Sequence, residues 1–207
     1  MSAKCGVRSA KCGVMAALAI FAGASFGAAP EMVKVGGEGK VAIVNACDAQ
    51  TAALDAALRK VANLLMINFE IKKGEWRLAD AQKCFDAAKA NAAVFIVKDK
   101  ALPMSLIAME SKWGVVNAEG LDEKGVMREA LRVATVVLGG ASSKYSASTM
   151  RPVFSKDDLA TKAGDLITFD SIMSISTYLP ELGIKPYQMM TREEAIEEGL
   201  IKADAKK

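Results

Sequence analysis

Two short runs of apolar residues constrain the fold of this chain more than any other feature. They are KVAIVNAC (40–47) and AAVFIVKD (92–99). Continuous apolar runs of this length are typical of strands buried on both faces of a sheet, because such strands have no side that faces water. Since helical segments alternate with these strands, the sequence predicts an α/β fold.

The segments around these runs predict the remaining elements. They are helices over 48–67, 77–91 and 121–140, a strand over 68–74, and a hairpin made of 104–110 and 113–118. Beyond them we expect mostly helix over 155–183, broken near Gly164, and a short last helix over 191–200 that opens with a capping pattern. The hairpin makes the sheet mixed. The predicted architecture is a single-domain αβα sandwich over residues 30–207, with 31–40 as a lead-in to the first strand.

Residues 1–29 have the composition of a secretory signal peptide. Three basic residues lie within the first eleven positions, and the apolar run VMAALAIFAGASFGAAP follows. A basic start, a short apolar stretch and an exit of small residues are the order of such a leader. We expect cleavage between Gly27 and Pro30 and a secreted or periplasmic protein with no membrane span. The alternative is an uncleaved membrane anchor.

Removal of this leader would leave a chain of balanced charge. The whole sequence has 27 Lys and Arg against 24 Asp and Glu, and the leader holds three basic residues and no acidic one. Nothing in this balance favours a nucleic-acid partner. Two cysteines, Cys47 and Cys84, would remain. In an oxidising compartment they could form a disulfide, or they could be two separately buried thiols.

The sequence lacks the residues that most catalytic sites need. It contains no histidine, which excludes Ser-His-Asp sites, Cys-His sites and histidine-ligated metal sites together. The stretch GGEGKV (36–41) lacks the spacing of a phosphate-binding loop and comes before a strand rather than after one. Acidic residues near 119–123 and 157–158 lie at predicted helix starts, where capping explains them. We therefore predict no catalytic residue, no metal ligand and no cofactor.

The end of the helix over 121–140 has the spacing of a metal motif without its ligands. In LRVATVVLGGASS (131–143) the helix runs into a Gly-Gly pair, and STM follows shortly after. Zinc peptidases of the metzincin type carry HExxHxxGxxH in such a place, followed by a turn with a Met. The matching positions in this sequence are Arg132, Val133, Val136, Gly139, Ser142 and, for the methionine, Met150. Only the glycine and the methionine match by identity.

The order of elements around this stretch resembles that of the archaemetzincins. The resemblance covers roughly residues 40–155, including VKDKAL, where the family has a D-x-D-L-like stretch, and the hairpin before the motif helix. It implies a metzincin-like core followed by a helical C-terminal part over 156–207. Archaemetzincins also hold a second zinc with four cysteines, whereas the matching SSKYSASTM has none, and the spacing to its methionine is about one residue longer. The resemblance therefore implies the fold with both metal sites lost.

Two interpretations of this degenerate motif remain open. Arg132 keeps its positive charge and has no lone pair for a metal. In the first interpretation 131–138 is a core helix, with Val136 partly filling the cleft and Arg132 reaching an acid or water. In the second the old groove is a peptide-binding cleft, and Arg132 grips a carboxylate in its floor.

These features predict an exported, catalytically inactive metzincin-like protein, or pseudoprotease, that acts by binding or assembly. A peptide or protein is the expected partner, with the hairpin strands over 104–118 as the edge to which an extended peptide would pair. The alternatives are a hydrolase with an unrecognised non-zinc active site and a structural, envelope-associated α/β domain. The sequence does not define the ligand or the oligomeric state.

Overall fold

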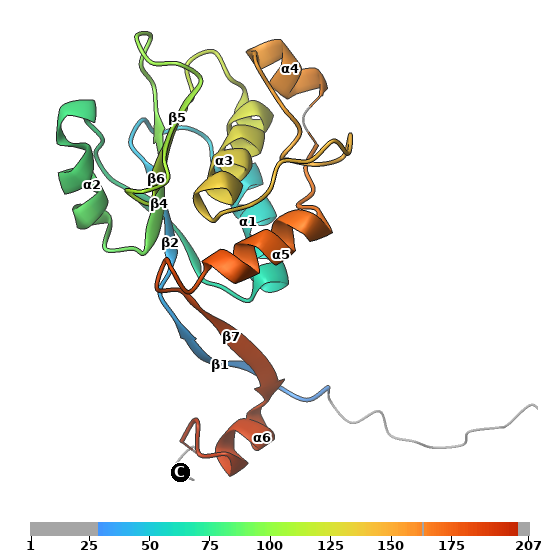
Figure 1. The fold of residues 1–207 in the computed structure, drawn as a ribbon. Helices are drawn as coiled ribbons and strands as arrows, with labels where there is room; N and C mark the ends of the chain where they lie inside the picture. Colours follow the sequence, from blue (N-terminus) through green and yellow to red (C-terminus); the bar gives the residue numbers. More distant parts are fainter. Residues whose placement is uncertain (1–28, 163, 203–207) are drawn as a thin grey trace, which may run out of the picture. The chain divides into compact units, whose positions relative to one another are not determined.

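The two apolar runs form neighbouring strands at the centre of a five-stranded sheet (Figure 1). The computed structural model describes residues 29–162 and 164–202. The sheet has the order β3-β2-β4-β6-β5. β2 (Val41–Asn45), β3 (Phe69–Lys73), β4 (Ala92–Val97) and β6 (Trp113–Asn117) are parallel, and β5 (Ser105–Ala108) is antiparallel to β6. All six residues of β4 are buried, as the continuous apolar run predicts.

Helices cover both faces of this sheet. On one face lie α1 (Ala52–Leu65) and α3 (Glu123–Val137); on the other lies α2 (Ala81–Ala88), which follows a short 3-10 turn, η1 (Leu78–Asp80). Alternate residues of β2 contribute to the two cores, which is why that strand has no polar side. The αβα sandwich with a mixed sheet that the sequence predicts is confirmed.

A separate two-stranded ribbon joins the two ends of the described chain. β1 (Met32–Glu38) pairs antiparallel with β7 (Lys185–Thr191). The prediction that 31–40 is only a lead-in was wrong, and no strand was predicted over 185–191. The ribbon escaped prediction because no residue of β1 is buried and because Gly36 and Gly37 interrupt its side-chain pattern.

The ribbon is attached to the main sheet's helical layer through Tyr187. This residue is 3% exposed. Its backbone N–H donates to the carbonyl oxygen of Met66 at 2.7 Å, and its hydroxyl donates to the carbonyl oxygen of Ala62 at 3.2 Å. One buried aromatic residue therefore connects the ribbon to the C-terminal end of α1.

The C-terminal part is less helical than the sequence predicts. The segment over 155–183 forms two short helices, α4 (Lys156–Thr161) and α5 (Phe169–Tyr178), with a break around Gly164 as predicted. α6 (Arg192–Glu197) begins with the predicted capping box: the Thr191 hydroxyl accepts from the N–H of Glu194, and the Glu194 carboxylate accepts from the N–H of Thr191.

The leader predicted over residues 1–29 lies outside the described residues apart from its last position. From Met32 onward the described residues belong to one compact unit. Among the helices of the described ranges, none combines the length and the apolar character needed to cross a membrane.

Candidate functional site

α3 carries the first positions of the degenerate motif and lies against the antiparallel edge of the sheet. The helix starts at Asp122, whose carboxylate accepts the N–H of Gly125 at 2.7 Å. It packs on β4, β6 and β5, and the chain leaves it through Gly139, which has a φ of 83° that favours glycine. The motif helix therefore lies directly beside the edge strand β5.

Val133, at the position of the motif's glutamate, belongs to the core. Its side chain is 0% exposed. It approaches Gly114 of β6 so closely that a Cβ on this glycine would lie 2.3 Å from the Val133 Cγ1. The side chain at this position thus fixes the distance between helix and sheet, and it presents nothing to a ligand.

Arg132, at the position of the first ligand, is held in an ion pair. Its Nε donates to one carboxylate oxygen of Glu129 at 2.8 Å, and its Nη2 donates to the other. Nη2 also donates to the Ser105 hydroxyl of β5 at 2.9 Å. Glu129 is 0% exposed and the Arg132 side chain 18% exposed. A bidentate pair of this kind is strong and directional, so Arg132 connects α3 to the edge strand.

The other motif positions lie on α3 and in the loop that follows it. Val136 is half-buried and shares a helix face with Arg132, four residues away. Ser142 is exposed, and Met150 is 7% exposed. The loop between them is closed by the N–H of Ser143, which donates to the carbonyl oxygen of Met150 at 3.1 Å. The chain thus passes from α3 through the turn at Gly139 into a closed loop that ends at the buried Met150.

These residues do not fit a zinc ion. Zinc in proteins takes imidazole, thiolate or carboxylate ligands, whereas Arg132 and Val136 offer no lone pair. Among the residues that the structure describes, no three Cys, Asp or Glu side chains are grouped so that they could hold a metal ion. The chain has no histidine. No step that depends on a metal can be assigned to this site.

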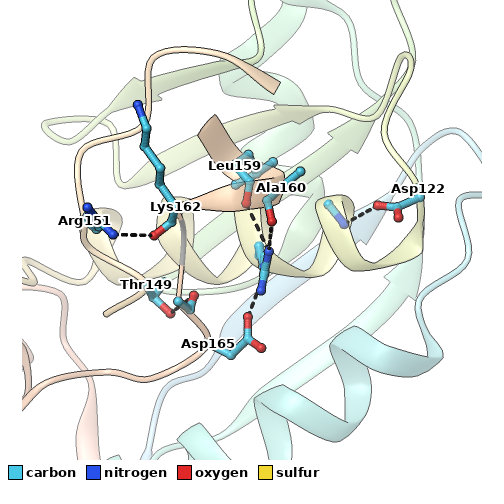
Figure 2. Close-up of polar contacts among 10 residues, drawn as sticks. Asp122, Thr149, Arg151, Leu159, Ala160, Lys162 and Asp165 are labelled. Atoms are coloured by element: carbon cyan, nitrogen blue, oxygen red, sulfur yellow. Dashed lines mark hydrogen bonds and ion pairs between the residues drawn. The ribbon is translucent and has the colours of Figure 1, made fainter. Parts of the chain in front are cut away.

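A second arginine of α3 fixes the C-terminal segment to the motif helix. Arg128 is 13% exposed, and its Nε lies 2.7 Å from the Asp165 carboxylate. Its Nη1 donates to the carbonyl oxygens of Leu159 and Ala160 at 3.2 and 2.7 Å. Figure 2 shows Asp165 and the carbonyl groups of Leu159 and Ala160 directed at α3 from the segment that packs beside this helix. The segment after Asp165 is therefore held in a defined place beside the helix.

This segment and the loop after α3 form an apolar pocket that the sequence did not reveal. The pocket has a volume of about 520 Å³, and its large exposed side chains are Tyr145, Leu166 and Phe169. They are 68, 61 and 71% exposed. The N–H of Thr149 donates to the Leu166 carbonyl oxygen at 2.8 Å and joins the two walls. Exposed apolar side chains that gather in this way mark binding surfaces. The signal in the sequence was Tyr145, an aromatic residue in the polar stretch SSKYSAS.

Cys47 and Cys84 are separate thiols on opposite faces of the sheet. Cys47 packs against the core beneath α1 and α3, and Cys84 packs against the core beneath α2. Both are half-buried and free, and burial raises the pKa of the Cys47 thiol. Because the sheet lies between them, the structure has the two separate thiols of the second prediction and not the disulfide of the first.

The sheet order and the helices that cover it form an archaemetzincin-like fold. Among solved structures, the chain is similar to a zinc-dependent peptidase from Methanocorpusculum labreanum, with a TM-score of 0.51, 8% identity and coverage of 65% of this chain and 99% of that one. It is also similar to archaemetzincin from Methanopyrus kandleri, with a TM-score of 0.53, 11% identity and coverage of 69% and 96%. No family model and no curated protein matches the sequence. The predicted resemblance to the archaemetzincin fold is confirmed.

Proposed function

We propose that this protein is an exported, catalytically inactive member of the metzincin-like folds that binds an extended peptide or protein segment. The observation that carries the proposal is the closed ion pair between Arg132 and Glu129 in the place of a metal ligand. A paired guanidinium in the place of an imidazole cannot support zinc-dependent peptide cleavage. The edge strand beside it remains available for binding.

β5 supplies this edge. Within the described residues it pairs with β6 alone. The N–H of Asn117 donates to the carbonyl oxygen of Met104, so these two residues form a hydrogen-bonded pair of the antiparallel ladder. Hydrogen-bonded and non-hydrogen-bonded pairs alternate along such a ladder. Ile107 and Gly114 are therefore a non-hydrogen-bonded pair, and the N–H and C=O groups of Ile107 point away from β6. An extended peptide can pair with such groups, and side-chain pockets then give specificity.

Arg132 has a different role in this proposal from the carboxylate anchor of the second interpretation. Its Nε and Nη2 already donate to Glu129 and Ser105. Its charge is matched by a carboxylate of its own helix, so a peptide carboxylate would have to displace Glu129. We therefore assign it to positioning β5. The apolar pocket of Tyr145, Leu166 and Phe169 is the better candidate for contact with a ligand side chain.

A backbone test separates edge pairing from other modes of binding. Peptides selected from a random displayed library on the purified protein would be measured against two variants of one residue. Ile107→Pro removes an outward N–H, whereas Ile107→Thr keeps it and changes only the side chain. The proline should weaken binding by about fivefold or more, the size of one net hydrogen bond, and the threonine should have little effect. Equal loss in both variants would contradict pairing at β5.

Two separate measurements test the proposed inactivity and the proposed export. Metal analysis of the purified protein should find no stoichiometric zinc, and peptidase activity should not respond to chelators. One tightly held zinc per chain would overturn the proposed inactivity. Mass spectrometry of exported material should find a first residue between Ala28 and Glu31. An intact N-terminus in the membrane fraction would favour the membrane anchor instead.

A further inference from the structure

A second pocket lies on the face of the sheet opposite α3, away from the degenerate motif. It has a volume of about 440 Å³ and lies between α2, the end of β3 and the connection that joins them. The floor is apolar and is formed by Val44, Cys84, Ala87 and Ala88. Gly74 passes close over this floor, because a Cβ on it would lie 2.5 Å from the Val44 Cγ1. Its size is within the range of small-molecule sites.

The charged residues around this floor are mostly basic, and all but one of the basic residues have an acidic partner. Lys73 pairs with Asp48 at 2.7 Å, Arg77 with Glu75 at 3.7 Å, and Lys83 with Asp80 at 3.0 Å. These three pairs are exposed and largely neutral as units. They contribute a polar rim but little net attraction for a ligand.

Lys72 is the exception. Its side chain is half-buried, and its ammonium donates to the carbonyl oxygen of Ala88, the last residue of α2. Among the described residues no acidic side chain lies in ion-pair contact with it: Glu70, two residues earlier, pairs with Lys40 and acts on Lys72 only at longer range. The end of a helix carries only a partial negative charge. The pocket therefore contains one ammonium whose direct partner is a carbonyl oxygen and not a carboxylate.

We propose that this pocket binds an aliphatic carboxylate, with the carboxylate on Lys72 and the hydrocarbon chain on the apolar floor. One cation without a carboxylate partner suits a monoanion, because a doubly charged phosphate would need further cations that are already paired. The floor offers no strong hydrogen-bonding side chain, so the body of the ligand is apolar. The site does not depend on the proposed function at β5.

The position of Cys84 gives a direct readout. Decanoate, below its micelle-forming concentration, would be added to the full-length protein before alkylation with iodoacetamide, and peptide mapping would follow Cys84 and Cys47 separately. Cys47 lies on the other face of the sheet and serves as the internal reference. Decanoate should protect Cys84 in a saturable manner and leave Cys47 unchanged. Decanol, which has the same chain without charge, should protect weakly.

Two variants and a control decide the assignment. Lys72→Gln should raise the half-saturating decanoate concentration by about tenfold or more, as expected for one charge-assisted hydrogen bond. Ala87→Phe, at an exposed floor position, should remove protection by filling the pocket. Lys60→Gln, an exposed lysine of α1, should have no effect. Absence of protection, equal protection by decanol, or an unchanged response in Lys72→Gln would each overturn the proposal.

Discussion

The ion pair of α3 predicts that its two members respond very differently to mutation. Arg132→Met leaves the Glu129 carboxylate, which is 0% exposed, without a cation. Breaking a buried pair in this way costs about 3–5 kcal/mol of unfolding free energy. Glu129→Leu leaves a guanidinium whose side chain is 18% exposed and can turn toward water. We expect that variant to lose only about 1–3 kcal/mol.

The double variant is the sharper measurement. Arg132→Met combined with Glu129→Leu replaces both charges by apolar groups of similar length, which is often neutral or stabilising by roughly 1–4 kcal/mol relative to the pair. The double variant should therefore be more stable than Arg132→Met alone. Urea unfolding, followed by the fluorescence of Trp76 and Trp113, measures all four proteins, and unchanged m-values would show that the same transition is compared. The cycle then gives the coupling between the two side chains.

Two results would refute this reasoning. Equal losses of unfolding free energy in the two single variants would mean that the burial of Glu129 does not determine how much stability is lost. A double variant as unstable as Arg132→Met would mean that the guanidinium stabilises α3 through Ser105 rather than through Glu129. Because small domains have only about 5–15 kcal/mol of total stability, a loss of the expected size is easily resolved.

Three further outcomes follow from the packing. Gly114→Ala should cost about 1–3 kcal/mol by forcing a methyl group against Val133, and the added change Val133→Ala should recover part of this loss in thermal unfolding. Burial raises the pKa of Cys47, so its alkylation should need a higher pH than that of a cysteine in a short peptide. The stabilisation that comes from keeping this thiol protonated should be complete at pH values below the thiol's pKa in the unfolded chain. It should be lost as the pH rises through the thiol's higher pKa in the folded protein. Tyr187→Ala removes the buried ring and its hydroxyl's bond to Ala62 but keeps the backbone bond to Met66, so limited proteolysis should then cut β1 and β7 while α3 stays protected.

The sequence predicted the central layers well because burial on both faces leaves a strong pattern. β4 has no polar residue at any position, and α3 has a clear cap and a glycine stop, so both were identifiable without tertiary information. The ribbon left no such pattern. Its strands are mostly exposed, and their partners lie at opposite ends of the chain.

At the site, the sequence indicated which residues occupy the motif positions, but it did not reveal the contacts that these residues make. The alternative that Arg132 reaches an acid is the one that the contacts support, and the acid is Glu129. An acidic residue three positions before an arginine on a helix is usually a surface pair. Only the fold shows that the carboxylate of this pair is fully buried. The pocket around Tyr145 and Phe169 needed the same information, because its walls come from separate segments.

The β1–β7 ribbon also affects the order in which this chain can fold. β1 is synthesised before every other described element, but its partner β7 comes after all of them except α6. The strands of the central sheet lie between residues 41 and 117, so that sheet can assemble while β7 does not yet exist. Contacts between residues far apart in sequence form slowly, even though closing a longer loop adds little to the equilibrium cost.

A chain that stops before β7 would therefore be a distinct species. It would contain every strand of the central sheet, but β1 would have no partner and the Met66 carbonyl oxygen would lack the N–H of Tyr187. An unpaired strand at the N-terminus is a ready substrate for proteases and for pairing with other chains. Closure of the ribbon thus distinguishes a completed polypeptide from a prematurely terminated one.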